Sequence, residues 1–275
     1  MINNICNIIE PNSILEQLAY TTVLIESNGK RGTGFLIQKE LPNKSVIPFL
    51  VTNKHVLYNE DTLCNEIKIK FRKATPEGKP SNELFEFSLG NFSKFCKPHS
   101  NPAVDLCAIN MLSIINSLQE KNIFLFIKCI PTDIIPSDEI LKELDYMEDI
   151  FMVGYPRGLS DELNNYPIFR RGVTATHPYV DYQGKREFLA DITCIGGSSG
   201  SPVFLKKEFN VDKHQNISIG SPKFYFMGIC YFTELTNTYT SDKEDKKKAI
   251  PTDKIYTTMN IAHIIKSSEI YELIK

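Results

Sequence analysis

Short apolar runs separated by turn residues recur along most of the 275-residue chain. Many of these runs alternate apolar and polar positions and are rich in β-branched and aromatic residues, a pattern that favours strands over helices. The runs cover residues 20–26, 33–38, 49–52, 66–71, 84–89, 105–110, 150–154, 168–176, 187–192, 200–205 and 223–233. Many short strands with turns between them predict an all-β fold, either a sandwich or a barrel.

Helical patterns are scarce along the chain. Helical spacing of apolar residues, in two cases behind a serine that can act as N-cap, predicts three short helices. These helices are expected at 13–19, 137–144 and 261–274. The last one, at the C-terminus, contains Ser267 and Ser268, where we expect a break. The two strand-rich halves of the chain meet near residues 115–145.

The composition is that of an ordinary globular protein, with 42% hydrophobic and 23% charged residues. A formal net charge of -2 provides no basic field that would attract nucleic acid or an acidic membrane, so neither is an expected partner. The N-terminus lacks the features of a secretory signal, and no run reaches the ~18 apolar residues that span a bilayer. We therefore expect a cytoplasmic protein.

Seven cysteines fit this expectation. Their number is odd and no C-x-x-C pair occurs, so neither a complete set of disulfides nor a zinc ribbon is indicated. Most of the cysteines lie in apolar surroundings, which predicts buried free thiols. No metal site and no cofactor are expected from these residues.

Three serines lie in the glycine-rich stretch 194–204, which reads CIGGSSGSPVF. Ser198 fits the G-x-S-x-G motif of α/β-hydrolases, in which a strand precedes the serine and a helix follows it. Here Pro202 and the strand-like residues VFL follow instead, and the alternation of strands and helices in such enzymes is missing. An esterase that uses Ser198 is therefore the least favoured alternative.

A second motif places the nucleophile at Ser199. The segment 197–202, GSSGSP, resembles the G-[DN]-S-G-[GS]-P signature of trypsin-like serine peptidases, which requires a histidine and then an aspartate ahead of the serine. His55 in FLVTNKHVL resembles the family's strand followed by T-A-x-H, and Asp105 in AVDLCAI resembles its D-[IL]-A-[LV] strand entry. The spacings of 50 and 94 residues are ordinary for the family.

Two further stretches strengthen this resemblance. KRGTGFLI at 30–37 resembles the G-[ST]-G-F-x-[IV] strand of HtrA-type members, and VGYPRG at 153–158 resembles their [IV]-G-[NY]-P-x-G turn. With five motifs in order over about residues 18–265, the chain is similar to trypsin-like, chymotrypsin-fold serine peptidases, and most of all to HtrA-type and intracellular bacterial or viral members. A PDZ domain is not expected, because the sequence stops at Lys275.

The resemblance implies an all-β fold of two six-stranded antiparallel β-barrels with a short C-terminal helix. The first barrel, over residues 18–125, would carry the histidine and the aspartate. The second barrel, over 126–275 together with the helix, would carry the serine and the oxyanion hole. Residues 1–17 would form an N-terminal extension.

The resemblance also implies a role for each site residue. His55 would be the general base, Asp105 would orient it, and Ser199 would attack the substrate carbonyl. The backbone at Gly197, Ser198 and Ser199 would form the oxyanion hole. Digestive members carry an aspartate where Ser198 stands, and it pairs with an N-terminus freed by cleavage. We therefore expect no activation by cleavage, and the serine loop must be ordered by packing, by a partner or by substrate.

The substrate pocket is expected to be neutral. Thr193 lies six residues before the nucleophile, where the family has the base of its S1 pocket, so we expect an apolar P1 residue. Other contacts are expected just before the serine and on an edge strand that pairs with the substrate backbone. The expected substrate-binding residues are Thr193, Cys194, Ile195, Gly196, Gly228, Ile229, Cys230 and Tyr231.

Two functions fit this architecture. The favoured one is an intracellular serine endopeptidase that acts on a protein or peptide substrate. The alternative is a gated or silent protease-fold module, acting as a subunit of a signalling or defence assembly, which would add a regulatory protein partner. An intact set of His55, Asp105 and Ser199 favours the first.

Overall fold

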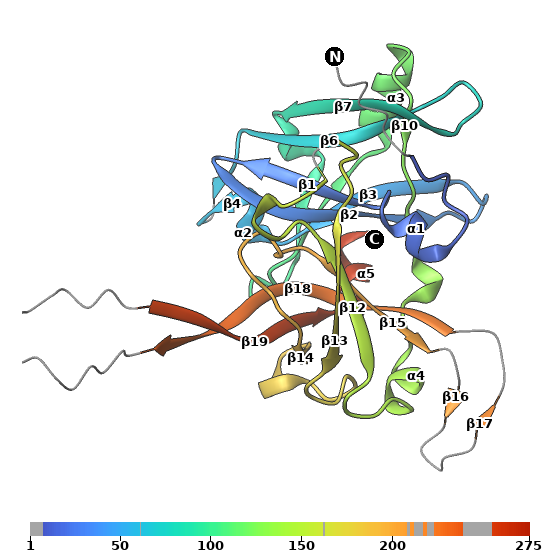
Figure 1. Cartoon of the computed structure of the whole chain (residues 1–275). Coiled ribbons are helices and arrows are strands. Elements are labelled where there is room, and N and C mark those ends of the chain that lie inside the picture. Colours follow the sequence, from blue (N-terminus) through green and yellow to red (C-terminus); the bar gives the residue numbers. More distant parts are fainter. Residues whose placement is uncertain are drawn as a thin grey trace, which may run out of the picture.

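The strands of the protein form two bodies, a nine-stranded sheet and a closed six-stranded barrel (Figure 1). The computed structural model describes residues 8–60, 62–161, 163–207, 210–211, 217–218, 223–238 and 255–275. The sheet draws its strands from the first half of the chain and the barrel draws its strands from the second half. The expected all-β fold is confirmed.

The first body is an open sheet in the described part of the chain. Its strands follow the order β10-β6-β1-β2-β3-β9-β8, with β7 paired to β6 and β11 paired to β2. The bounds are β1 (Thr22–Ser27), β2 (Lys30–Glu40), β3 (Val46–Thr52), β6 (Glu66–Ala74), β7 (Pro80–Gly90), β8 (Cys96–Pro98), β9 (Cys107–Asn110), β10 (Leu125–Phe126) and β11 (Ile130–Pro131). The prediction of a six-stranded barrel is not confirmed here, because no pairing joins the two ends of this sheet.

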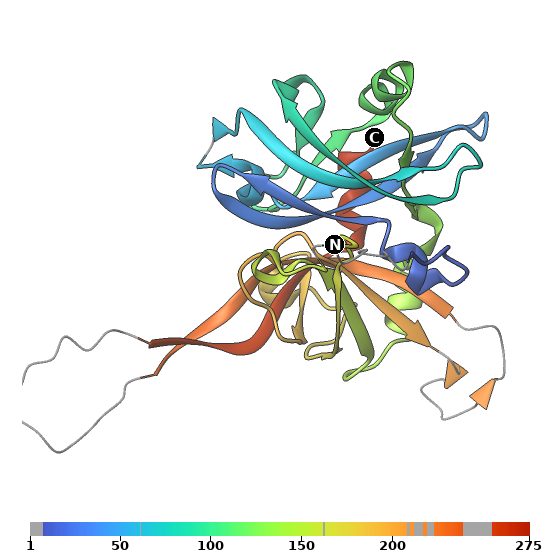
Figure 2. The ribbon, with the colours of Figure 1, turned by 45° about the horizontal axis from the view of Figure 1, so that its top comes forward.

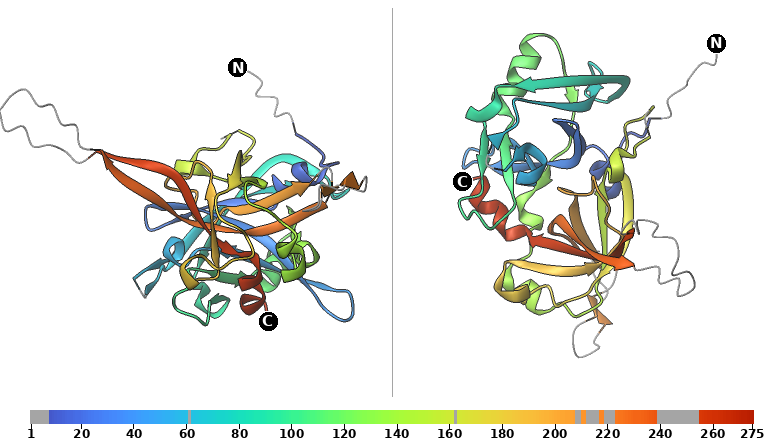
Figure 3. Two further views of the ribbon diagram at one scale, coloured as in Figure 1. Left: turned by 90° about the horizontal axis from the view of Figure 1, so that it is seen from below. Right: turned by 90° about the vertical axis from the view of Figure 1, so that its left-hand side faces the viewer.

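The second body is a closed barrel of six antiparallel strands, as predicted. The strands run in the order β12 (Asp149–Gly154), β13 (Ile168–Thr174), β14 (Glu187–Asp191), β19 (Ile255–Lys266), β18 (Lys223–Thr238) and β15 (Pro202–Lys207). Strands β18 and β19 continue beyond the barrel as a two-stranded arm (Figures 1 and 3). Two small hairpins pair β4 (Tyr58–Asn59) with β5 (Thr62–Leu63) and β16 (Asn210–Val211) with β17 (Ile217–Ser218).

The helices are short and lie between or beside the strands. They are α1 (Ile14–Leu18), α2 (Lys54–Leu57), α3 (Leu112–Glu120), α4 (Asp138–Lys142) and α5 (Ile270–Leu273). Two expectations are confirmed: α1 begins with a capping box of Ser13 and Glu16, and α4 is capped by Ser137. Helix α3 was not expected, although Ile114 and Leu118 give it a buried face.

The expected C-terminal helix over 261–274 is wrong for its first half. Residues up to Lys266 belong to β19, and helix α5 forms only after the predicted break at Ser267 and Ser268. Successive residues from Ala262 to Lys266 in β19 are all buried, so this part of the strand is covered on both faces. A run of apolar residues buried on both faces lacks the alternation that identifies a strand, and periodicity cannot separate it from a buried helix.

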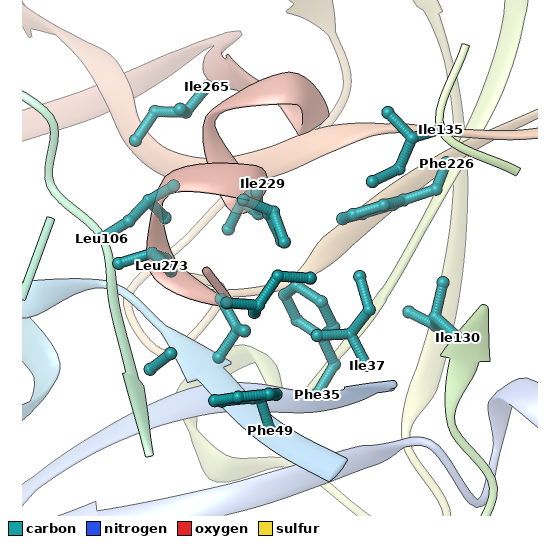
Figure 4. Close-up of a cluster of buried hydrophobic side chains, with 14 of the residues drawn as sticks. Phe35, Ile37, Phe49, Leu106, Ile130, Ile135, Phe226, Ile229, Ile265 and Leu273 are labelled. Carbon is teal, nitrogen blue, oxygen red and sulfur yellow. The ribbon is translucent and has the colours of Figure 1, made fainter. Parts of the chain in front are cut away.

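The main hydrophobic core joins the two bodies. Phe35 and Phe49 from the sheet meet Phe226 and Ile229 from the barrel, and Leu273 of α5 packs among them (Figure 4). The rings of Phe35 and Phe226 lie edge to face with centroids 5.4 Å apart. Figure 2 shows the C-terminal α5 rising from the barrel against the sheet. The site residues on the two bodies are thus held on one packed unit.

Candidate active site

His55 lies where the central strand β3 ends. The strand stops at Thr52, and the one-turn helix α2 then carries the histidine, with Val56 and Leu57 buried behind it. The His55 side chain is 49% exposed, so its ring faces outward while the rest of the turn is anchored. The side-chain amide of Asn53 donates to the backbone carbonyl of Asp105 at 2.8 Å and ties this turn to the next site residue.

Asp105 holds the histidine by two hydrogen bonds. Its Oδ2 lies 2.5 Å from Nδ1 of His55, and its Oδ1 accepts from the backbone N–H of His55 at 3.1 Å. The next residue, Leu106, is fully buried in the core between the two bodies and fixes the backbone of the aspartate (Figure 4). A carboxylate at Nδ1 places the proton on that nitrogen and leaves Nε2 as the basic one.

Two consecutive tight turns build the serine loop. The N–H of Ser198 donates to the carbonyl of Ile195 at 2.9 Å, and the N–H of Ser201 donates to that of Ser198 at 3.0 Å. Each turn contains a glycine in the left-handed region, Gly197 at φ 90° and Gly200 at φ 87°. Strand β15 follows directly, so no helix follows Ser198, and the α/β-hydrolase alternative is wrong.

The serine loop is docked on the nine-stranded sheet. The N–H of Thr33 on β2 donates to the carbonyl of Ser199 at 2.8 Å, and the Thr52 hydroxyl donates to the carbonyl of Thr33 at 2.7 Å. A Cβ at Gly200 would lie 1.9 Å from the Thr33 carbonyl oxygen and 2.6 Å from the Thr52 hydroxyl oxygen. Only a glycine permits this approach, which brings Ser199 beside the strand end that leads into His55.

A second set of hydrogen bonds orients the backbone of the serine loop. The carbonyl of Gly196 accepts from the N–H of Arg157 at 2.6 Å, in the turn after β12. Because the peptide is planar and trans, the N–H of Gly197 points away from Arg157. Within the described residues, the N–H groups of Gly197 and Ser199 meet no acceptor. The N–H of Ser198 donates to the carbonyl of Ile195, so of the three residues expected around the oxyanion hole Ser198 has no free N–H.

The Ser199 hydroxyl is not bonded to another group of the described chain, His55 included. The hydroxyl is half-buried at the loop tip, and no side chain competes for it. Nucleophile–base contacts are often long before substrate binds and shorten in the complex. The geometry therefore offers a free hydroxyl and an oriented imidazole, on two bodies that are joined by Thr33.

Comparison with protein families gives one match that covers most of the chain. The family described as the trypsin-like peptidase domain matches residues 32–211. The chain belongs to the trypsin-like peptidase family. The match includes His55, Asp105 and Ser199. No curated protein sequence matches this chain.

Solved structures similar to this peptidase are distant in sequence. Rv3671c from M. tuberculosis H37Rv, in an inactive form, is 13% identical with a TM-score of 0.45, over 96% of this chain and 89% of that one. A Glu endopeptidase in complex with MPD is 12% identical with a TM-score of 0.48, over 96% and 94%. Human heparin binding protein is 8% identical with a TM-score of 0.49, over 94% and 91%.

The segment before the serine contains Thr193, Cys194, Ile195 and Gly196, four of the residues expected to bind substrate. Thr193 is exposed, and its carbonyl accepts from Nη1 of Arg170 at 2.5 Å. Cys194 is buried, Ile195 is half-buried, and Gly196 is exposed with nothing within 4 Å of where a Cβ would be. Thr193 and Gly196 are thus the exposed residues of this segment, and Ile195 is partly exposed.

The predicted substrate edge needs a correction. Gly228 and Ile229 are paired with β15 on one side and with β19 on the other, and Cys230 exchanges backbone hydrogen bonds with the serine loop. The Ile229 side chain points into the core (Figure 4). These three residues cannot add a substrate strand. The edge left without a paired strand in the described chain begins at Tyr231, and Phe232 and Thr233 follow on it.

This offset could not be predicted from the sequence, because the pairing of β18 on its second side depends on where β15 begins. Phe232 and Thr233 are the edge residues that sequence reasoning missed; they pair with β19 on one side only. Phe232 is exposed at 47%, large for an apolar ring, which suits a residue that a bound peptide covers.

Among the described residues, no group of three or more His, Cys, Asp or Glu side chains could hold a metal ion. No helix in the same ranges is long and apolar enough to cross a membrane.

Proposed function

We propose that the protein is a serine endopeptidase with the triad His55, Asp105 and Ser199. The two-point contact of Asp105 with the ring and the backbone of His55 carries the proposal, because it fixes the tautomer that a general base needs. Membership of the trypsin-like peptidase family supports it. The docking of the serine loop next to the strand that leads into His55 supports it as well.

The proposed reaction proceeds through an acyl-enzyme. Nε2 of His55 takes the proton of the Ser199 hydroxyl while the oxygen attacks the peptide carbonyl. The N–H groups of Gly197 and Ser199 stabilise the oxygen anion of the tetrahedral intermediate. His55 returns the proton to the leaving amine, and water then hydrolyses the ester by the same route. Asp105 stabilises the imidazolium throughout and stays ionised.

We propose that the substrate binds as an added strand. Its backbone would pair with Tyr231–Thr233, where β18 has a free edge in the described chain. The neutral Thr193 at the expected base of S1 supports an apolar P1 residue, and no carboxylate is available there for Arg or Lys. Cleavage of a peptide library would give the P1 residue directly.

The gated module is the second candidate, and one observation favours it. The Ser199 hydroxyl and the His55 ring do not form a hydrogen bond in this structure. In that case the site would need a regulatory partner or substrate to close. A cytoplasmic location and such a partner are parts of this proposal that localisation and co-purification would test.

Proteolysis of an unfolded protein substrate tests the proposed function. Purified wild type should release peptides from casein, His55→Ala should lose this activity, and His177→Ala should keep it. His177 is the matched control, because its ring accepts from the N–H of Tyr179 in a loop outside the triad. Equal activity in both variants would reject the triad. Inactivity of folded wild type would favour the gated module.

A further inference from the structure

Two thiols that the proposed mechanism does not use lie in contact behind the serine loop. Sγ of Cys194 and Sγ of Cys230 are 3.1 Å apart, and both side chains are buried. Cys194 is five residues before the nucleophile, and Cys230 lies on β18 directly before the proposed substrate edge. A disulfide bond is ~2.05 Å long, so the sulfur atoms are about one ångström from bonding distance.

The backbone on both sides of this pair is already fixed. The N–H of Cys230 donates to the carbonyl of Ser201 at 3.0 Å, and the N–H of Gly200 donates to the carbonyl of Cys230 at 2.8 Å. These bonds hold β18 against the serine loop whether or not the thiols are joined. Closure therefore needs side-chain rotation and a small shift, with no rearrangement of the strands.

The two thiols differ in acidity in the way that a reactive pair requires. The hydrogen bond with Cys230 lowers the pKa of Cys194 against the opposing effect of burial, and the Ser198 hydroxyl and the positive Arg170 lower it further. The same hydrogen bond, together with complete burial, raises the pKa of Cys230 well above its usual value. Cys194 is thus the thiolate that attacks an oxidant, and Cys230 is the thiol that resolves the product.

We propose that Cys194 and Cys230 form a redox modification site that closes to a disulfide on reaction with a hydroperoxide. The Cys194 thiolate attacks one peroxide oxygen, the O–O bond breaks, and a sulfenic acid and hydroxide form. Sγ of Cys230 then attacks the sulfenic sulfur, the S–O bond breaks, and the Cys230 proton leaves with the oxygen as water. Two thiols lose two electrons, and hydrogen peroxide ends as two waters. The deep burial of both thiols restricts the oxidant to a small peroxide.

The position of the bridge gives it a role at the proposed active site, and this part rests on the proposed function. The disulfide would tie the segment before Ser199 to the strand that continues into Tyr231. Both elements are walls of the expected substrate pocket. Peroxide would therefore act on substrate binding and leave His55 and Asp105 untouched.

Peptide mapping tests the bridge without any use of proteolytic activity. Reduced, desalted protein is treated with hydrogen peroxide, unfolded, alkylated with iodoacetamide, digested and analysed by mass spectrometry. The expected product is a pair of peptides joined through Cys194 and Cys230, about 2 Da lighter than the two reduced peptides and separated by dithiothreitol. Cys129 is the internal reference, because burial raises its pKa to about 11 and it should remain alkylated.

The variant Cys230→Ser tests the first oxidation step by itself, because it removes the thiol that would close the disulfide. In Cys230→Ser, Cys194 should stop at the sulfenic acid, which dimedone captures when the oxidised protein is unfolded. Full alkylation of both thiols after peroxide, or a bridge that joins either of them to another cysteine, would overturn the proposal. Because the readout is covalent structure, loss of the bridge and loss of the proposed peptidase activity are independent results.

Discussion

The hydroxyl of Thr33 donates a hydrogen bond of 2.9 Å to the carbonyl of Gly197, across the boundary between the open sheet and the closed barrel. The same hydroxyl accepts from the N–H of Tyr155 at 2.9 Å. The backbone of Thr33 also binds the carbonyl of Ser199 and the hydroxyl of Thr52. This fully buried side chain therefore holds the serine loop from within the protein, which is one of the three routes expected where Ser198 replaces the activation aspartate.

Removal of the Thr33 hydroxyl should slow catalysis more than it weakens binding. Thr33→Val keeps the shape but leaves the Gly197 carbonyl and the Tyr155 N–H without a partner, at about 1–3 kcal/mol for each buried group. We expect kcat to fall by about ten- to a hundredfold with a smaller change in KM, because the donors at Gly197 and Ser199 lose alignment. Thr33→Ser should restore kcat. A Val variant with wild-type kcat and unchanged thermal stability would contradict this role.

The two glycines before the serine pair should respond differently to alanine. A Cβ at Gly197 would lie 2.7 Å from both the Arg157 nitrogen and the Tyr155 oxygen, on backbone at φ 90°. A Cβ at Gly196 would meet nothing within 4 Å. Gly197→Ala should therefore displace one oxyanion donor and lower kcat by about 10²–10³, whereas Gly196→Ala should stay near wild type. Equal kcat values would show that the N–H of Gly197 has no part in the reaction.

Asp105→Asn should leave the fold intact and stop most turnover. An amide cannot accept from Nδ1–H of His55 in the way that the carboxylate does, and its own N–H favours the tautomer with the proton on Nε2. We expect kcat to fall by about 10⁴, the general size of this effect in such triads. Asp149→Asn, which breaks a surface pair with Arg171, is the matched control and should keep its activity. A small decrease for Asp105→Asn would mean that the carboxylate does not set the tautomer.

The rate of disulfide formation should depend on pH through Cys194. The thiolate is the reactive form, so the rate rises with pH and reaches half its maximum at the pKa of this thiol. The Cys230 thiol, the Ser198 hydroxyl and Arg170 lower that pKa, so the half-point should lie below 9.0, the ordinary value. Ser198→Ala removes one donor and should move the half-point upward. A half-point at or above that of free N-acetylcysteine would reject Cys194 as the attacking group.

Local motifs were enough to find the residues of the proposed triad. His55, Asp105 and the glycines around Ser199 stand in short stretches whose spacing the family fixes, and Gly197 and Gly200 do adopt the left-handed backbone that such a loop needs. The contacts that Thr33 makes with the serine loop could not be predicted, although the motif at 30–37 that contains this residue was identified. Its hydroxyl binds Gly197 and Tyr155, which are 164 and 122 residues away in the chain, and no local pattern encodes that contact.

The predictions that were wrong or not confirmed all depended on which other elements surround a strand. A strand pattern does not tell how many neighbours a strand has, so Gly228–Cys230 were assigned to a free edge that in fact begins at Tyr231. Residues 261–266 resembled a helix because a strand buried on both faces loses its alternation. The closure of the first body likewise depends on pairing between strands far apart in the chain.

The central claim is that Ser199 is the nucleophile of an accessible peptidase site, and labelling with a fluorophosphonate probe tests it most directly. The probe phosphonylates a serine that an oriented histidine activates, and mass spectrometry then identifies the modified residue. Wild type and Ser198→Ala should carry the adduct at Ser199, and Ser199→Ala should carry none. An adduct at Ser198, continued labelling of Ser199→Ala, or no labelling of folded wild type would contradict the claim.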